Sequence, residues 1–314
     1  MKIGIPRALL YHKHHKFWTT FFDEIGVDYI VSPETDKQIV TDGSNLAIDE
    51  ACLPSKIMLG QVAWLIDKCD YIFVPRQKYW LKYEMCTKFW ALPDLVNTTF
   101  RDKKVKLLYY DIYDRKVYRE RKAVFKMGKY LGVKRSQIKY AYVMAKQAQM
   151  NYDMLREQQQ KAVLENSTKT KILIVAHSYC VGDKYIGEPI VSAVKALGCE
   201  PIIADYIDER EGIRASQSVT TTMQWPYNRQ LVGAVELLKD KVDGIILVTA
   251  FPCGTDSMMD ELLIRKYKDK PMITLTVDAQ SGTAGMETRL ESFVDIIELK
   301  KQAQRQSLGA TDGE

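Results

Sequence analysis

The sequence predicts an α/β protein with two Rossmann-like, parallel-sheet lobes that are joined by a helical connector. Short apolar runs alternate with helical patterns, which is typical of a parallel sheet. This alternation stops after residue 114 and restarts near residue 169 with the same order of elements. In each half the third strand leads into a loop that carries a cysteine, Cys86 in the first and Cys253 in the second. We therefore expect lobes at 1–114 and 169–301, a connector at 115–168 and a disordered tail at 302–314.

The first lobe is expected to begin with a strand rather than a signal peptide, because the N-terminal segment lacks an apolar core and a small-residue cleavage site. A helix rich in aromatic residues follows and stops at Gly26. A later helix has Pro54 near its start, where a missing N–H has little effect. The third strand is expected to end at Pro75. The predicted strands are 2–6, 29–31, 71–74 and 105–110, and the predicted helices are 9–25 and 49–66.

The connector and the second lobe are predicted in the same way. Between residues 115 and 165, Lys, Arg, Gln, Met and Ala recur at helical spacing with a break at Gly132. This pattern predicts two or three helices, and heptads are not sustained, which disfavours a coiled-coil arm. In the second lobe we predict strands at 170–176, 201–204, 243–248 and 271–277, a helix ending at Gly198, and helices at 229–239 and 287–300.

The composition excludes several classes of protein. The chain has 314 residues, of which 46% are hydrophobic and 27% are charged, as in soluble globular proteins. The net charge of +5 is spread out, and no nucleic-acid motif stands out, so we do not expect nucleic-acid binding. No apolar stretch approaches the roughly 20 residues of a membrane helix. A cytoplasmic location is expected, where cysteines stay reduced.

The six cysteines divide into two groups by their sequence context. Cys69 and Cys199 precede strands and are expected to be small buried hydrophobes. The other four lie at strand exits or helix starts, and they are Cys52, Cys86, Cys180 and Cys253. There is no C-x-x-C pair, so spacing alone leaves metal binding, catalysis and simple burial open.

Two further groups are weaker candidates. His177 lies three residues before Cys180, and the two could form a thiol–imidazole pair, although a histidine that is hydrogen-bonded at a strand end is the stronger reading. Ser281, Gly282 and Gly285 follow the last strand and could cradle an anion with backbone N–H groups. A tight structural turn explains this segment equally well. No Walker A motif is present, so ATP hydrolysis is not expected.

Several segments resemble the activase-related proteins of the 2-hydroxyacyl-CoA dehydratase system, the CoA enzyme activase uncharacterised domain, and more distantly the dehydratase subunits. The matching segments keep the order of that family along nearly the whole chain. They are Lys2-Ile-Gly-Ile-Pro-Arg-Ala-Leu9, Asp49-Glu-Ala-Cys-Leu-Pro-Ser-Lys56, Asp70-Tyr-Ile-Phe-Val-Pro-Arg76, Cys86-Thr-Lys-Phe89 with Leu92-Pro-Asp94, Pro252-Cys-Gly-Thr-Asp-Ser257 and Gly285-Met-Glu-Thr-Arg-Leu-Glu-Ser-Phe-Val-Asp295.

The resemblance implies Rossmann-like subdomains that hold an iron–sulfur cluster, most often [4Fe–4S], at the cleft between the lobes. Cys52, Cys86 and Cys253 match the motif cysteines of the family. The implied function is low-potential electron transfer, or lyase chemistry by radical dehydration of an acyl-CoA, in a homo- or hetero-oligomer. A separate ATP-dependent activase, or another electron donor, would supply the electron. The alternatives are a cluster-free accessory or scaffold subunit and a Cys/His thiol enzyme.

The chain departs from the family pattern at several positions. Thr87 stands where proline is expected, and Trp90-Ala91 stands where glycine is more common. The segment from Asp278 to Gln280 is less acidic than the family version. Cys180 replaces an asparagine of the family pattern, so it is either a fourth ligand that is peculiar to this chain or a neutral replacement.

Overall fold

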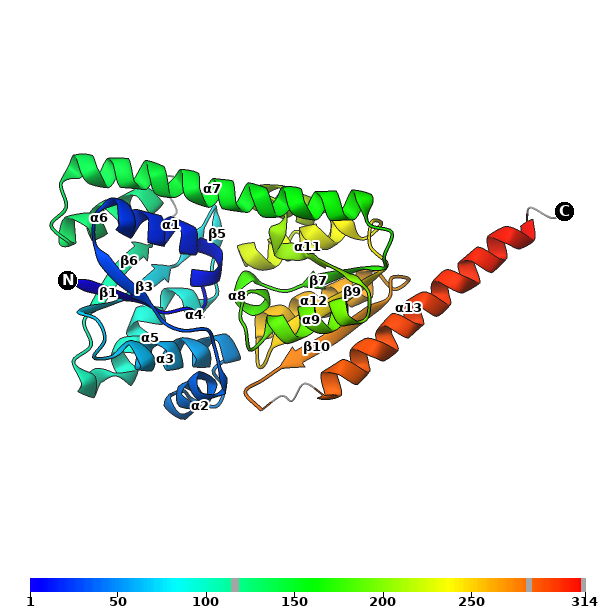
Figure 1. Cartoon of the computed structure of the whole chain (residues 1–314), viewed down its shortest axis with the longest axis horizontal. Helices are drawn as coiled ribbons and strands as arrows, with labels where there is room; N and C mark the ends of the chain where they lie inside the picture. Colours follow the sequence, from blue (N-terminus) through cyan, green and yellow to red (C-terminus); the bar gives the residue numbers. More distant parts are fainter. Residues whose placement is uncertain (114–118, 281–283, 312–314) are drawn as a thin grey trace.

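Two parallel sheets lie side by side in the computed structural model, and one long helix runs along both (Figure 1). The structure describes residues 1–113, 119–280 and 284–311. The long helix is α7 (Arg135–Asn166), and α6 (Arg119–Tyr130) precedes it. Gly132, in the turn between these helices, has a φ of 76°, a conformation that favours glycine. The predicted α/β class with two Rossmann-like lobes and a helical connector is confirmed.

The first lobe is a four-stranded parallel sheet with the strand order β2-β1-β3-β6. Its first three strands and their helices are β1 (Lys2–Ile5), α1 (Tyr11–Glu24), β2 (Asp28–Val31), α2 (Lys37–Leu46), α3 (Leu53–Leu65) and β3 (Tyr71–Gln77). The later elements are β4 (Tyr79–Trp80), β5 (Tyr83–Glu84), α4 (Thr87–Trp90), α5 (Leu92–Thr99), η1 (Arg101–Lys103) and β6 (Leu107–Ile112). The short strands β4 and β5 form an antiparallel hairpin between β3 and α4.

The second lobe is also a four-stranded parallel sheet, with the order β10-β9-β7-β8. Its first half comprises β7 (Lys171–Val175), α8 (Ser178–Val181), α9 (Gly187–Ala196), β8 (Glu200–Ile203), η2 (Ala204–Tyr206), α10 (Glu209–Ala215) and η3 (Ser216–Ser218). The remaining elements are α11 (Pro226–Leu238), β9 (Gly244–Ala250), α12 (Gly254–Lys266), β10 (Met272–Val277) and α13 (Ala284–Thr311). Numbered within each lobe, both sheets have the strand order 2-1-3-4.

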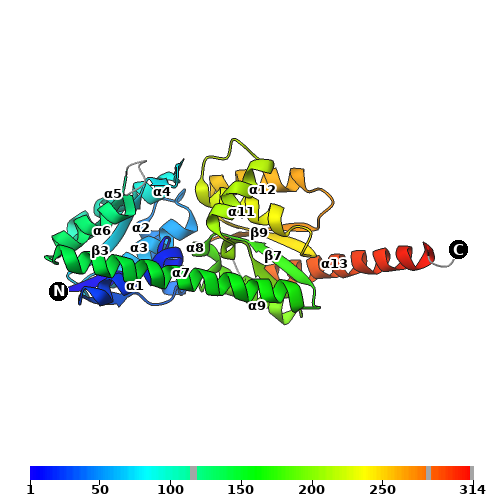
Figure 2. The same cartoon turned by 90° about the horizontal axis from the view of Figure 1, so that it is seen from above.

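Two buried glutamines of helix α7 form hydrogen bonds to the two lobes. In the first lobe, Gln149 accepts a hydrogen bond from the Phe17 N–H (3.1 Å) and donates one to the Lys13 carbonyl (3.0 Å). In the second lobe, Gln160 donates to the Ile203 carbonyl (3.0 Å) and accepts from the N–H of the same residue (2.7 Å). Seen from above, α7 extends across the junction of the two lobes (Figure 2). These hydrogen bonds add to the packing of its buried Ile138, Ala141 and Ala145 side chains and hold the connector in place.

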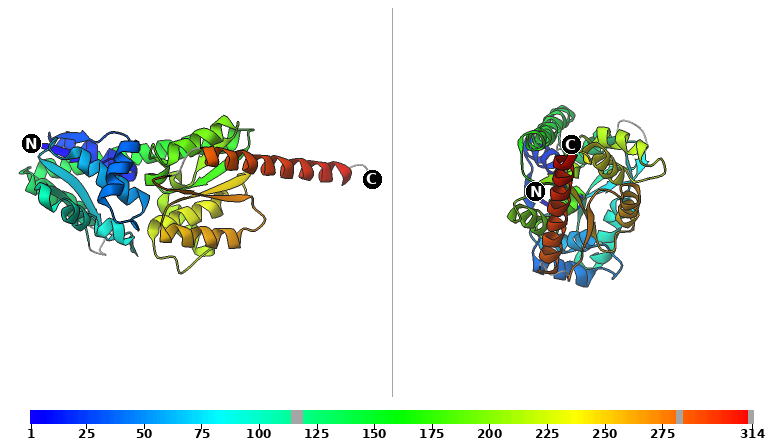
Figure 3. Two further views of the ribbon diagram at one scale, coloured as in Figure 1. Left: turned by 90° about the horizontal axis from the view of Figure 1, so that it is seen from below. Right: turned by 90° about the vertical axis from the view of Figure 1, so that its right-hand side faces the viewer.

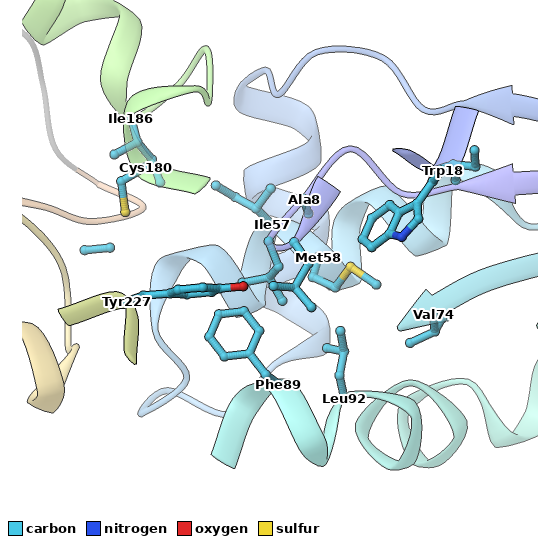
Figure 4. Packing of buried hydrophobic residues seen from close by; sticks show 14 of the residues in the cluster. Ala8, Trp18, Ile57, Met58, Val74, Phe89, Leu92, Cys180, Ile186 and Tyr227 are labelled. Carbon is cyan, nitrogen blue, oxygen red and sulfur yellow. The ribbon is translucent and has the colours of Figure 1, made fainter. Parts of the chain in front are cut away.

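The hydrophobic core continues from the first lobe into the junction. One cluster of buried side chains includes Ile57 and Phe89 of the first lobe together with Cys180 and Tyr227 of the second. In Figure 4 the ring of Tyr227, from α11, lies against Ile57 and Phe89. The junction between the lobes is therefore packed like a protein interior, and the site that it contains depends on both lobes.

Two elements extend further than the sequence predicts. Strand β3 was expected to end at Pro75 but continues to Gln77, because the residues from Ile72 to Gln77 pair with β6 while the pairing with β1 stops at Ile72. Pro75 thus faces a neighbour on one side only, where a missing N–H is tolerated.

The last helix also differs from the expected tail at 302–314. Helix α13 continues to Thr311 and projects away from the second lobe (Figure 3), while 312–314 lie outside the described residues. Within the described part of the chain, no helix combines the length and the apolar character that a membrane crossing requires. The lobe boundaries at 114, 168 and 301 remain predictions.

Candidate functional site

Three of the predicted cysteines, Cys52, Cys86 and Cys253, line one small cavity at the junction of the lobes. The first lobe supplies Cys52 and Cys86, and the second supplies Cys253, so neither lobe forms the site alone. Cys86 follows β3 and Cys253 follows β9, which places them beyond the carboxyl ends of the two sheets. Open α/β sheets bind their ligands at this position. The cavity has a volume of about 30 Å³, enough for one or two water molecules.

Cys52 directly precedes helix α3. Pro54 lies in the first turn of this helix, where its missing N–H removes no helical hydrogen bond. The Cys52 carbonyl accepts hydrogen bonds from the N–H groups of Ser55 (2.8 Å) and Lys56 (3.1 Å), and its Sγ lies 3.2 Å from Ser55 Oγ. The N-terminal end of a helix favours negative charge, so a bound anionic group beside Cys52 would be stabilised there.

Cys253 occupies the same position at the start of α12, and its Sγ lies 3.3 Å from Thr255 Oγ1. A backbone hydrogen bond joins the loop of Cys253 to the loop of Cys52. The Leu53 N–H donates to the Phe251 carbonyl at 2.9 Å. Because Leu53 follows Cys52 and Phe251 lies two residues before Cys253, this bond holds the two cysteine loops together across the lobes.

Cys86 begins the short helix α4, just after the β4–β5 hairpin. Its carbonyl accepts a hydrogen bond from the Phe89 N–H at 2.9 Å. The Phe89 ring contacts the rings of Tyr179 (5.8 Å between centroids) and Tyr227 (6.1 Å) from the second lobe. These three aromatic rings line the cavity and reduce its access to water.

The electrostatics of the cavity favour neutral thiols in the absence of a metal. Burial raises the pKa of the Cys86 thiol. Burial and the nearby Asp256 carboxylate together raise the pKa of the Cys253 thiol well above its usual range. A metal that binds thiolates must therefore displace these protons, so loading of such a site would release protons.

A buried polar network forms one wall of the cavity. His177 Nε2 lies 2.8 Å from Asp256 Oδ1, and the Asn228 side chain donates to the same oxygen at 2.9 Å. The His177 ring stacks on Tyr179 at 4.8 Å. Burial by itself would raise the pKa of the Asp256 carboxyl, but His177, Asn228 and Cys253 lower it on balance. The network holds a negative charge beside Cys253.

The remaining candidates from the sequence lie elsewhere. Cys180 is fully buried in α8 and is not among the residues that line the cavity. His177 Nε2 faces Asp256, and the contacts of the described residues include no side-chain hydrogen bond from His177 to Cys180. Ser281 and Gly282 lie outside the described residues, and Gly285 lies at the start of α13 beside a different cavity.

Sequence reasoning missed Asp256 and Asn228, the polar partners of His177. Asp256 lies in the first turn of α12, where an acidic residue is explained by the start of a helix alone. Asn228 and Tyr227 follow Pro226 at the beginning of α11, and Trp225 precedes it. The aromatic residues beside this proline indicate either the lining of a cleft or packing in the core, and their sequence context favours packing.

Among the described residues, no group of three or more His, Cys, Asp or Glu side chains is placed to hold a metal ion.

A comparison with known protein families gives a match. The family model of the CoA enzyme activase uncharacterised domain matches residues 2–207. The chain belongs to this family. The match includes Cys52, Cys86 and Cys180, whereas Cys253 lies beyond it. No curated protein matches this chain. The resemblance in the sequence is thus confirmed at the level of the family.

Proposed function

We propose that this protein binds an iron–sulfur cluster, expected to be [4Fe–4S], through Cys52, Cys86 and Cys253. We further propose that it acts in low-potential electron transfer or in radical dehydration of an acyl-CoA, together with a separate ATP-dependent activase. The family supports a relation to the acyl-CoA dehydratase activase system. The observation that carries the proposal is the meeting of three thiols from two lobes at one cavity.

The surroundings of the cavity suit such a group. When bound, an iron–sulfur cluster supplies one-electron chemistry whose potential depends on charge, hydrogen bonds and solvent exposure. Cys52 and Cys253 lie at the N-terminal ends of helices α3 and α12, which would stabilise the negative charge of a thiolate-ligated cluster. Phe89 and Tyr179 limit access of water. Three protein thiolates leave one iron of a [4Fe–4S] cluster open to a substrate or a further ligand.

The small size of the cavity affects how an iron–sulfur cluster would bind in it. A volume of about 30 Å³ is smaller than a cluster of four irons requires. Binding must therefore move the three cysteine loops apart, and the Leu53–Phe251 hydrogen bond is the contact between two of these loops. We expect the cluster and the docking of the lobes to be coupled.

The test is anaerobic reconstitution of the wild-type protein and of single cysteine variants, followed by iron and sulfide analysis. Cys52→Ser, Cys86→Ser and Cys253→Ser should each retain well under half of the wild-type iron. Cys199→Ser is the matched control, because Cys199 is a buried cysteine outside the cavity and should keep full iron content.

The same experiment separates the alternatives. A cluster-free scaffold gives an iron-free protein in every variant, including the wild type. A thiol enzyme that depends on Cys180 gives an iron-free protein whose Cys180 reacts with iodoacetamide faster than Cys199 does. Iron that is lost on Cys180→Ser, and not on Cys253→Ser, would overturn the assignment of the ligands.

A further inference from the structure

Helix α7 carries exposed apolar side chains on the face that points away from the lobes. Its buried residues, which include Ile138, Ala141 and Ala145, lie on the opposite face. Several large apolar side chains of this helix remain 51–57% exposed, and they are Tyr140, Val143, Met150, Met154 and Leu155. Helix α7 forms the upper edge of the molecule in Figure 1, so a partner can approach this face.

Most of these side chains follow the heptad spacing of paired helices. The residues that share the outward face are separated in turn by 3, 4, 3 and 4 positions, and they are Tyr140, Val143, Gln147, Met150 and Met154, here called the α7 stripe. Two repeats are too short for a free coiled-coil arm. Helix α7 is already held on both lobes, however, so a partner would not have to stabilise the helix itself.

The charged side chains beside the α7 stripe lie on one flank and change sign along the helix. Lys139 and Lys146 lie toward the N-terminal end of this flank. Asp153 and Glu157 lie toward its C-terminal end. A second copy that runs in the opposite direction complements this pattern, because the basic half of each helix then faces the acidic half of the other.

These charges are only partly neutralised within the chain. Lys146 contacts Glu120 at 3.2 Å, and Glu157 contacts Lys161 at 2.8 Å. Lys139 is exposed and has no ion pair among the described residues. A carboxylate of a second copy can therefore approach Lys139 without displacing an existing pair.

A lipid surface fits the α7 stripe less well than a second copy does. Helices that lie on membranes carry Lys and Arg along the polar face beside their apolar residues, and anionic lipids attract them. Asp153 and Glu157 make half of this flank acidic, and an anionic surface would repel that half. The flank thus complements itself and not a surface of a single charge.

We propose that two copies of this chain pair through α7, with the two helices antiparallel about a twofold axis near Gln147. In this register Val143 of one copy packs on Met154 of the other, and Gln147 packs on Met150. Lys139 of each copy then lies beside Glu157 of the other. The paired segment from 140 to 158 is about 27 Å long at 1.5 Å per residue.

The expected dimer is weak and leaves the cysteine cavity free. A single helix pair lies at the small end of the range of stable interfaces, so we expect a dissociation constant in the micromolar range. No residue of the α7 stripe lines the cysteine cavity, so the proposal does not depend on the iron–sulfur cluster. Met150 and Met154 also border a cleft between the lobes, and pairing would cover part of its edge.

Sedimentation velocity of the full chain under reducing conditions tests the proposal. We expect the mass to rise from 36.1 kDa toward twice that value as the concentration is raised. Val143→Glu and Met154→Glu should each weaken self-association at least about tenfold, because each places a charge within the helix contact. Leu299→Glu is the matched control, because Leu299 is 64% exposed on α13, away from the stripe, and this variant should dimerise like the wild type.

An exchange of charges tests the antiparallel direction. Lys139→Glu and Glu157→Lys should each weaken the dimer by at least about threefold, because like charges then face each other. The variant that carries both substitutions should regain the wild-type affinity to within about twofold. In a parallel pair each of these residues would face its own copy, and the double variant would recover nothing.

The measurements include results that would overturn the proposal. One is a single species of 36.1 kDa at every concentration up to about 200 µM, well above the expected dissociation constant. Another is a dimer that Val143→Glu and Met154→Glu leave intact or that Leu299→Glu disrupts. A double charge variant that stays as weak as the single variants would contradict the antiparallel arrangement. Circular dichroism verifies that each variant is folded, which is expected because the substituted side chains are exposed.

Flotation with vesicles of phosphatidylcholine and phosphatidylglycerol tests the other occupant. We expect no binding of the wild-type protein to these vesicles. Binding that Met154→Glu abolishes would assign the α7 stripe to a membrane surface and overturn its assignment to a second copy.

Discussion

The two lobes have the same strand order but contribute different residues to the cysteine cavity. Both sheets have the strand order 2-1-3-4, and in both the loop after the third strand carries a cysteine. The helix before that strand begins with Cys52 and Pro54 in the first lobe and with Trp225 and Pro226 in the second. Trp225 thus occupies the place that Cys52 has in the first lobe, and both line the cavity.

A second difference appears three residues after each of the equivalent cysteines. Phe89 follows Cys86 and is 4% exposed, whereas Asp256 follows Cys253 and is 1% exposed. In the first lobe the Phe89 ring covers the cavity. In the second lobe His177 and Asn228 hydrogen-bond to the Asp256 carboxylate. The two halves of the site therefore have the same topology but carry chemically different residues at equivalent positions.

Removal of the carboxylate should have the largest effect on stability. Asp256→Ala leaves His177 and Asn228 without their shared acceptor in a buried position, so we expect a loss of about 3–5 kcal/mol in the free energy of unfolding. Urea denaturation measures it. Asp240→Ala, at an exposed carboxylate, should change the same quantity by less than about 0.5 kcal/mol. Equal effects in the two variants would contradict a structural role for the buried network around Asp256.

Each lobe has a glycine at which two helices pack closely together. Replacing either glycine should lower the free energy of unfolding by a similar amount. A Cβ on Gly43 would lie 1.9 Å from the Lys56 carbonyl oxygen of α3, and a Cβ on Gly233 would lie 1.7 Å from the Gly212 carbonyl oxygen of α10. Each clash is with backbone, so Gly43→Ala and Gly233→Ala should each destabilise by about 2–3 kcal/mol, despite the better helix propensity of alanine.

Thermal unfolding of these variants checks the expectation. Gly285→Ala is the control, because a Cβ there meets no atom within 4 Å. A large loss for one lobe and none for the other would show that the two helix pairs are not equivalent.

The second lobe should also have its own pH dependence. Burial raises the pKa of the Asp260 carboxyl to about 6, although the Thr249 hydroxyl, which donates to it at 2.6 Å, acts in the opposite direction. Asp256 and His177 are the charged or titratable groups that influence it. The folded state binds a proton here more readily than the unfolded state. Stability from this group is therefore present below the unfolded pKa of 3.8 and is lost as pH rises through about 6.

The variant Asp260→Asn tests the predicted direction of this pH dependence of stability. The variant should match the wild type near pH 4 and exceed its free energy of unfolding by about 2–3 kcal/mol near pH 8. Urea denaturation across this range measures the difference. A difference that is constant with pH would contradict the assignment of the effect to Asp260.

Exchange of the equivalent residues should have the most specific effect on the site. Trp225→Cys would place a fourth thiol where the second lobe now has an indole. In the reconstituted protein we expect the electron paramagnetic resonance spectrum to lose its response to added cyanide, because the open iron gains a thiolate ligand. An unchanged response would mean that position 225 does not face the cluster.

Much of this fold was predictable from the sequence because parallel strands are buried on both faces and appear as continuous apolar runs. The ends of strands and helices narrow the six cysteines to Cys52, Cys86, Cys180 and Cys253, and the family resemblance then selects Cys52, Cys86 and Cys253. The hydrogen bond from Leu53 to Phe251 and the contact of His177 with Asp256 join segments distant in the chain, and such contacts leave no local pattern. The extent of β3 past Pro75 depended in the same way on a neighbour, β6.

The most direct test of the central claim is the iron and sulfide content of the wild-type protein after anaerobic reconstitution, with the absorption spectrum recorded on the same sample. The account predicts about four irons and four sulfides per chain, and a brown protein that bleaches in air. A colourless protein without iron would contradict it, and the shared cavity of Cys52, Cys86 and Cys253 would then be a feature of packing alone.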